Sequence, residues 1–160
     1  MRVFSLIFIG GCTAFATYQT PIVTPKDEVS FGFSISGFFV NDTSLPFPGI
    51  PLSIPSFMLR YGVTDNSDIG FLFTGFPVFG STTLDYKYQF LNNNGFLSAF
   101  DIGSGFWFFP SEERPLFVYP FFGLSFGNER IYVALRGTYN YFSQRATTVS
   151  TFSGSMILGA

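Results

Sequence analysis

The side chains with the most chemical potential in this sequence are polar residues that occur at every second position. In residues 84–90, LDYKYQF, Asp85, Lys87 and Gln89 alternate with Leu84 and three aromatic rings. Successive side chains of a β-strand point to opposite faces, so the spacing predicts a polar face and an apolar face. Carboxylate, ammonium and amide groups on one face could neutralise one another, bind a small polar ligand or line a narrow polar passage.

Charges on other segments with the same period are predicted to join this face. The candidate polar cluster consists of Arg60, Asp85, Lys87, Gln89, Asp101 and Arg136, with Asp68 as a further candidate. The interior of an eight-stranded barrel is just wide enough for side chains, so opposite charges there would pair. The structural interpretation is mutual neutralisation away from lipid, and the functional alternative is a polar pathway or a small-ligand pocket.

The remaining candidates for catalysis or metal binding are weak. The sequence contains no histidine, which excludes the Ser-His-Asp triad and the usual His-containing metal sites. Glu112 and Glu113 are sequence neighbours in a predicted loop, and turn formation explains Asp65 and Asp68 without a cation. Residues 103–105, GSG, lack the strand-to-helix context of a nucleophile elbow. We therefore predict no catalytic residue, no metal site and no cofactor.

Composition limits the class of protein. The 160 residues, enough for one domain, are 47% hydrophobic, 21% aromatic and 11% charged, whereas soluble domains carry roughly 25% charged residues. The formal net charge is −2, and no run of Lys or Arg indicates nucleic-acid binding. This composition excludes disorder and suits strands that expose apolar side chains to something other than water.

A period of two continues from residue 28 almost to the end of the chain. It predicts eight strands, near residues 28–40, 54–63, 68–76, 82–91, 96–109, 115–126, 130–142 and 148–158. Short Asn- and Gly-rich turns alternate with longer connections, as they do in membrane barrels. The predicted fold is all-β, an antiparallel up-and-down transmembrane β-barrel of about eight strands or an incomplete larger barrel.

Two features depart from this regular pattern. Pro120 lies inside the sixth predicted strand and cannot donate a ladder hydrogen bond, so we expect a bulge or a local break in pairing there. The sequence also finishes at Ala160 without the terminal aromatic residue usual in such barrels. Two alternatives follow, a barrel closed by these eight strands and an incomplete larger barrel with further strands.

Several tyrosines fall on the predicted apolar face. These are Tyr61, Tyr86, Tyr88, Tyr139 and Tyr141. Amphipathic rings of this kind concentrate where membrane meets water, whereas in a soluble sandwich they would pack against a second sheet. The low content of charged residues favours the membrane interpretation.

The start of the chain indicates secretion and lipid attachment. Residues 1–12 read MRVFSLIFIGGC, with one basic residue, a short apolar run and two glycines before Cys12. This start resembles the bacterial lipobox, in which the cysteine becomes the acylated N-terminus; the alternative is an ordinary signal peptide with an incidental cysteine. We predict a signal peptide at 1–11, a lipidated tether at 12–27 and a β-barrel at 28–160.

Three segments of the sequence resemble bacterial outer-membrane β-barrel lipoproteins of unassigned activity. They are CTAFATYQTP at 12–21, LRYGVTD at 59–65 and LDYKYQF at 84–90. The resemblance implies barrel architecture and no particular activity. The lipobox-like start and the period of two predict a non-enzymatic protein anchored in the outer membrane through Cys12. The expected partners are outer-membrane lipids and other envelope proteins, and the expected role is structural or one of interaction. A small channel or transport module for polar solutes is the alternative.

Overall fold

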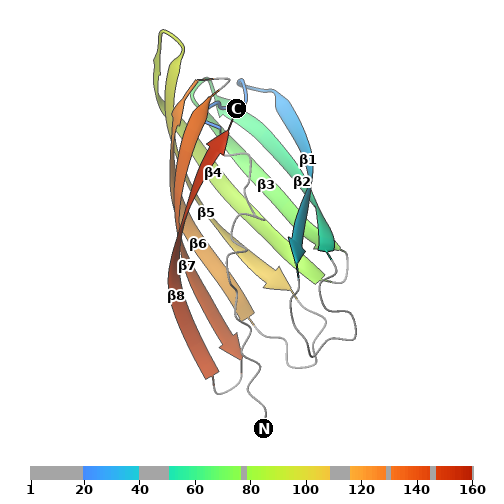
Figure 1. Ribbon diagram of the computed structural model, residues 1–160. Helices are drawn as coiled ribbons and strands as arrows, with labels where there is room; N and C mark the ends of the chain where they lie inside the picture. Colours follow the sequence, from blue (N-terminus) through green and yellow to red (C-terminus); the bar gives the residue numbers. More distant parts are fainter. Residues whose placement is uncertain are drawn as a thin grey trace.

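The chain forms one antiparallel sheet of eight strands (Figure 1). The computed structural model describes residues 20–39, 51–76, 79–108, 116–128, 131–144 and 147–159. The strands are β1 (Val29–Phe39), β2 (Pro51–Thr64), β3 (Ser67–Phe76), β4 (Phe79–Asn93), β5 (Phe96–Phe108), β6 (Leu116–Gly127), β7 (Tyr132–Gln144) and β8 (Thr147–Gly159). They pair in sequence order, which confirms the predicted up-and-down arrangement, and each boundary lies within three residues of its prediction. Among the described residues, no helix has the length and hydrophobicity needed to cross a membrane.

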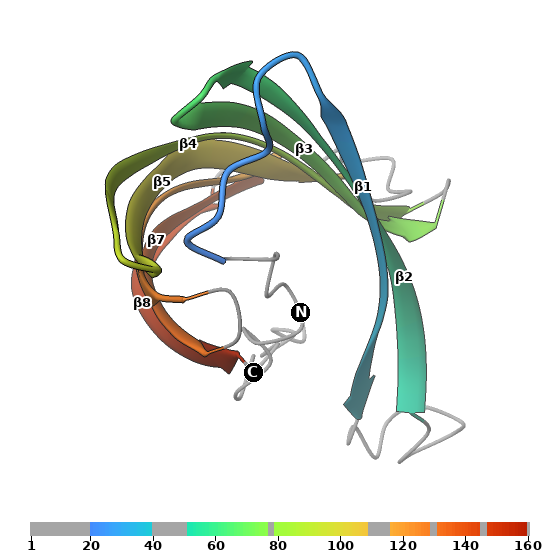
Figure 2. The ribbon, with the colours of Figure 1, turned by 90° about the horizontal axis from the view of Figure 1, so that it is seen from above.

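The sheet is curved but open, so the prediction of a closed eight-stranded barrel is wrong. Figure 2 shows the strands following an arc, and β1 and β8 are the two edges of the described sheet. Residues 20–26 lie on its concave side, where main-chain atoms take up space in addition to the inward side chains. A ring of eight strands leaves room for little more than side chains.

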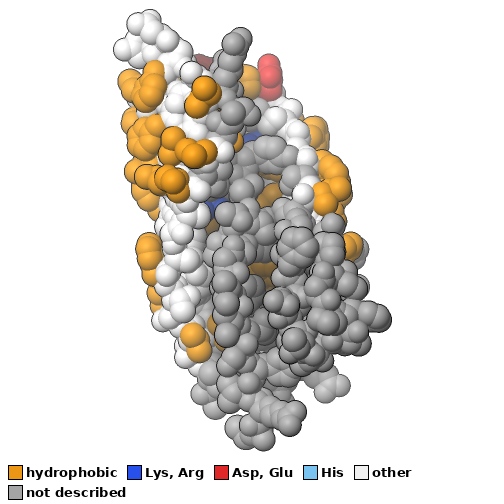
Figure 3. Space-filling model, in the orientation of Figure 1, with side chains coloured by type: hydrophobic (Ala, Val, Ile, Leu, Met, Phe, Trp, Pro, Cys, Tyr) orange, Lys and Arg blue, Asp and Glu red, His pale blue; other side chains and the backbone are white. Residues whose placement is uncertain are grey.

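The two faces of the sheet have the polarity that the period of two predicts. On β4, Asp85, Lys87 and Gln89 are buried on the concave face, while Leu84 and Phe90 are at least half exposed on the convex face. Figure 3 shows hydrophobic side chains spread along the outer surface on both flanks of the molecule. The sheet thus inverts the usual order of a water-soluble domain, in which apolar side chains are inside.

Pro120 interrupts the ladder on one side of its strand. On the β5 side it is paired with Ser104, but on the β6–β7 side the register passes from Val118 to Phe121 without pairing Tyr119 or Pro120. The register is the same before and after the gap, so the break is local. This outcome confirms the predicted interruption and shows that no bulge is needed to absorb it.

The β4–β5 turn supplies a test of the strand connections. Asn94 and Gly95 have φ angles of 49° and 82°, and nothing lies within 4 Å of a Cβ placed on Gly95. We expect Gly95→Ala to lower the free energy of unfolding by about 1 kcal/mol, because only the left-handed backbone opposes the new methyl group. Urea unfolding, followed by the fluorescence of the single tryptophan, Trp107, measures the change.

Gly154→Ala on β8 is the matched control, since Gly154 lacks a left-handed φ and a Cβ there meets only the Arg136 carbonyl oxygen at 3.8 Å. Equal losses in the two variants would contradict the assignment of the cost to backbone conformation.

Candidate functional site: a charged belt on the concave face

The register of the sheet places six charged side chains in two adjacent rows across the concave face. In the first row Asp68 pairs with Lys87, Lys87 with Asp101, and Asp101 is separated from Arg136 by Gly123. In the second row Arg60 is opposite Gly70, and Gly70 is opposite Asp85. We call the six the charged belt: Arg60, Asp68, Asp85, Lys87, Asp101 and Arg136. The belt contains three positive and three negative side chains, so its formal charge is zero.

Arg60 joins the two rows of the belt. Its Nε donates to Asp68 Oδ1 at 3.0 Å, and its Nη2 donates to Asp85 Oδ2 at 2.7 Å. The three side chains are almost wholly buried, with exposed fractions of 7%, 0% and 6%. An ion pair removed from water is retained only where hydrogen bonds satisfy both partners, and the forked guanidinium meets that requirement here.

Arg136 and Asp101 form the second ion pair of the belt. Arg136 Nη2 donates to Asp101 Oδ2 at 3.2 Å, and the guanidinium carbon lies 3.8 Å from the centre of the Phe121 ring. Phe121 is buried on the concave face and is one of the few apolar residues there. The ring and the carboxylate together compensate the loss of water around the cation.

Two glycines leave room for the arginines to reach their partners. Gly70 lies between Arg60 and Asp85 in the register, and Gly123 lies between Asp101 and Arg136. A Cβ at Gly70 would overlap Arg60 and Asp85, and a Cβ at Gly123 would overlap Asp101. The sequence pattern alone missed these glycines because their role depends on which residues stand opposite them on neighbouring strands.

An N-terminal stretch, residues 20–26, lies against the belt; we call it the inner segment (Figure 2). Lys87 Nζ donates to the carbonyl oxygens of Thr20 and Ile22 at 3.0 and 3.3 Å. Gln89 Nε2 donates to the carbonyl oxygen of Pro21 at 2.9 Å. The side chains of β4 thus recognise main-chain atoms of the inner segment.

The far end of the inner segment is fixed to β1, β2 and β3. The Thr24 amide donates to Asp68 Oδ2 at 2.7 Å, and the Thr24 and Ser30 hydroxyls are 2.9 Å apart. The Asp27 amide donates to the Gly62 carbonyl at 2.9 Å, and a side chain at Gly62 would overlap Pro25. The chain therefore turns from the concave side into the sheet at Asp27, against Gly62 of β2.

The inner segment belongs to the lipidated tether predicted at residues 12–27. The structure places residues 20–27 in contact with the sheet, and Pro21, Val23 and Thr24 are buried. Main-chain hydrogen bonds hold the segment, and no side-chain periodicity reveals such bonds in a sequence. Cys12 and the beginning of the tether lie outside the described residues.

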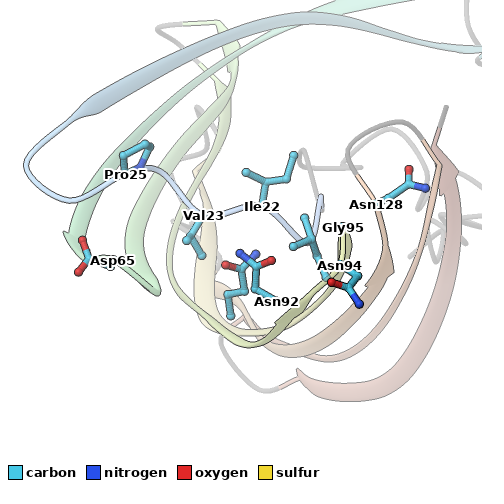
Figure 4. A pocket seen from close by; sticks show the side chains of 10 residues that line it. Ile22, Val23, Pro25, Asp65, Asn92, Asn94, Gly95 and Asn128 are labelled. Atoms are coloured by element: carbon cyan, nitrogen blue, oxygen red, sulfur yellow. The ribbon is translucent and has the colours of Figure 1, made fainter.

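A cavity of about 670 Å³ opens beside the inner segment at the short-turn end of the sheet (Figure 4). Amide side chains dominate its polar lining. The lining residues are Ile22, Val23, Pro25, Asp65, Gln89, Asn92, Asn94, Gly95, Leu97 and Asn128. We call this cavity the mouth. Amide groups both donate and accept hydrogen bonds, so the mouth can bind water or a polar solute without favouring one sign of charge.

The other predicted site residues fall in three places. All predicted members of the polar cluster lie on the concave face, together with Asp68. Among the tyrosines, Tyr61, Tyr86, Tyr88 and Tyr139 are exposed and Tyr141 is half-buried. Glu112 and Glu113 lie outside the described residues.

The described residues give no support for a metal site. Asp65 is exposed in the β2–β3 turn, whereas Asp68 is fully buried and bound to Arg60, so the two carboxylates serve separate purposes. Within the described ranges, no group of three or more His, Cys, Asp or Glu side chains could hold a metal ion.

Comparisons with known proteins identify no relative: no protein-family model, curated protein or solved structure matches the chain.

The belt makes a specific prediction about stability. Arg60→Met is expected to lower the free energy of unfolding by about 3 kcal/mol, because Asp68 and Asp85 are left buried without their cation. The triple variant Arg60→Met, Asp68→Asn, Asp85→Asn is expected to recover at least half of that loss, since neutral amides replace the stranded carboxylates. Urea unfolding of the variants measures both values. A triple variant no more stable than the single one would contradict the pairing.

Proposed function

We propose that this protein is a membrane-embedded β-barrel component of the bacterial outer membrane with a structural or interaction role and no catalytic activity. The observation that carries the proposal is the inverted burial of the sheet. Charged and hydroxyl side chains are buried on the concave face, and large apolar side chains are exposed on the convex face. Lipid is the environment in which this distribution is favourable.

The convex face is too apolar for water. Phe31, Phe152 and Leu158 are 80%, 76% and 72% exposed, and further exposed Leu, Ile, Phe or Val side chains lie on each of the strands β2 to β7. Soluble monomers rarely expose an apolar patch larger than roughly 300–600 Å². Acyl chains would cover this face at every strand, whereas a protein partner would cover only part of it.

A soluble β-sandwich explains the arrangement less well. A sandwich needs an apolar face on which a second sheet packs and a polar face toward water. Here the shielded face carries ion pairs such as Arg60–Asp68, and all the described strands belong to a single sheet. The apolar face is therefore the outside, which favours a membrane protein over a sandwich.

The interaction role concerns the two edge strands of the sheet, which need further strands to pair with. β1 and β8 are edge strands of 11 and 13 residues among those described. Unpaired amide and carbonyl groups are strongly disfavoured in the hydrocarbon region, so spanning sheets are closed. We infer that further strands complete the ring between these edges, and that its lumen is wider than that of an eight-stranded barrel.

Lipid attachment at Cys12 is compatible with this arrangement. Cys12 precedes Thr20, the first described residue, by eight positions. An extended chain of eight residues spans at most about 29 Å, enough to link a membrane surface to the mouth of the sheet. Acyl chains on Cys12 and the exposed tyrosines of the convex face would then hold the protein at a fixed depth.

Vesicle flotation tests membrane embedding. We expect the refolded protein to float with phospholipid vesicles through high salt and alkaline carbonate. Leu84→Lys and Ile102→Lys on the convex face should each reduce the floated fraction, because a lysine facing the bilayer core costs about 2–4 kcal/mol. Asn92→Lys near the β4–β5 turn is the control and should float like the wild type. A wild-type protein that stays in the aqueous fraction would refute the proposal.

A further inference from the structure

The inner segment occupies the polar side of the sheet, where a passage through the molecule would run. We propose that residues 20–26 are a plug that closes the short-turn mouth of a polar passage, and that small polar solutes cross the membrane when this plug is displaced. The inference rests on the membrane location proposed above and adds a transport activity to it.

The hydrogen bonds that hold the plug suit a segment that can leave. Lys87, Gln89 and Asp68 all bind main-chain atoms of the inner segment. Such bonds exchange for bonds to water with a small change in free energy. The few buried side chains of the segment include Val23, a small apolar residue. Its attachment therefore depends mainly on replaceable polar contacts.

A hinge lies where the plug joins the sheet. Asp27 has a φ of 61°, and its amide is bonded to the Gly62 carbonyl, while the Gly62 amide donates to Glu28. These bonds fix the chain directly after residue 26. The Glu28 amide also donates to the Pro25 carbonyl, and Lys26 forms a bridge with Gly62. The inner segment can therefore swing about residues 25–28 without separating β1 from β2.

The wall behind the plug remains neutral when the plug is absent. Arg60 keeps its bonds to Asp68 and Asp85, and Arg136 keeps its bond to Asp101. Lys87 stands between Asp68 and Asp101 in the register, so its charge stays compensated after it loses the plug carbonyls. The exposed wall would be hydrated and would carry both signs of charge, which suits small polar solutes rather than one class of ion.

The cavity at the mouth supplies an approach to this wall. Ile22, Val23 and Pro25 of the plug form one side of the cavity, and Gln89 and the turn amides form the other (Figure 4). Gln89 lines the cavity and also donates to Pro21, so it links solute approach to plug retention. Removing that bond should favour the open form without changing any charge.

Gln89→Leu in lipid vesicles is the primary test. Efflux of a trapped sugar is expected to rise about fivefold over the wild type, the change in open population produced by losing one buried hydrogen bond. Asn140→Leu is the matched control, because Asn140 donates to Ser153 on β8. It should leave efflux unchanged.

A second measurement follows the plug itself. In a Cys12→Ser background, a cysteine replacing buried Val23 should react slowly with a water-soluble maleimide and several-fold faster when Gln89→Leu is added. Asn140→Leu should not accelerate the reaction. This readout reports displacement of the plug independently of efflux.

A reversible lock provides the opposite perturbation. The Thr24 and Ser30 hydroxyls are 2.9 Å apart, so Thr24→Cys with Ser30→Cys places two thiols within disulfide reach. In the Cys12→Ser, Gln89→Leu background, oxidation should reduce efflux to that of protein-free vesicles, and reduction should restore it. Each single-cysteine variant should be insensitive to oxidation.

The outcomes separate the plug from the membrane proposal. Failure of the wild type to float with vesicles would overturn the membrane location. Normal flotation, with neither efflux nor Val23→Cys labelling raised by Gln89→Leu, would overturn the plug and leave the membrane location standing. Faster labelling without increased efflux would show a mobile segment and would overturn the passage.

Discussion

The pairing of buried charges across the concave face is the interaction on which the structure depends. Arg60 bonds to carboxylates on β3 and β4, and Arg136 reaches from β7 over Gly123 to Asp101 on β5. Buried ions require partners at fixed positions, so these bonds restrict the register of each strand pair they cross. A slip of one residue would move charges onto the convex face and apolar side chains onto the concave face. The belt therefore determines both the register and the inverted polarity of the sheet.

The same belt explains why the concave side can hold a stretch of polypeptide. Lys87 stands between two carboxylates in the register and directs its ammonium group to two carbonyl oxygens of the inner segment. Gln89, one pleat further along β4, binds the next carbonyl. Residues 20–26 thus satisfy polar groups that would otherwise need water. In the proposed plug, the bonds to these main-chain atoms would be replaced by bonds to water when residues 20–26 leave the concave face. The passage is then closed by the segment and opened by its displacement.

The period of two was sufficient to predict the strands but insufficient to predict how they close. Alternation in residues 84–90 identified the polar face of β4, and the position of Pro120 identified a break in the ladder. The pairing of Arg60 with Asp85 depends on Gly70 standing between them, which only the register reveals. The predicted closure was wrong, since the described sheet is open (Figure 2). The packing of residues 20–26 was also missed, because the segment is held through main-chain atoms and its sequence, TPIVTPK, resembles an ordinary linker. Strand periodicity predicts the two faces of the sheet, but it contains no information about the segment that packs on the concave face.

The most direct test of the central claim is a nitroxide scan along β4 in lipid vesicles. Single spin labels at positions 84 to 89 would be compared for relaxation by oxygen, which concentrates in lipid, and by a water-soluble nickel chelate. The inverted sheet predicts oxygen maxima at positions 84, 86 and 88, where Leu84, Tyr86 and Tyr88 are exposed, and minima at Asp85, Lys87 and Gln89. Nickel relaxation that peaks at positions 84, 86 and 88, with no oxygen maximum there, would contradict the account, because the apolar face would then meet water.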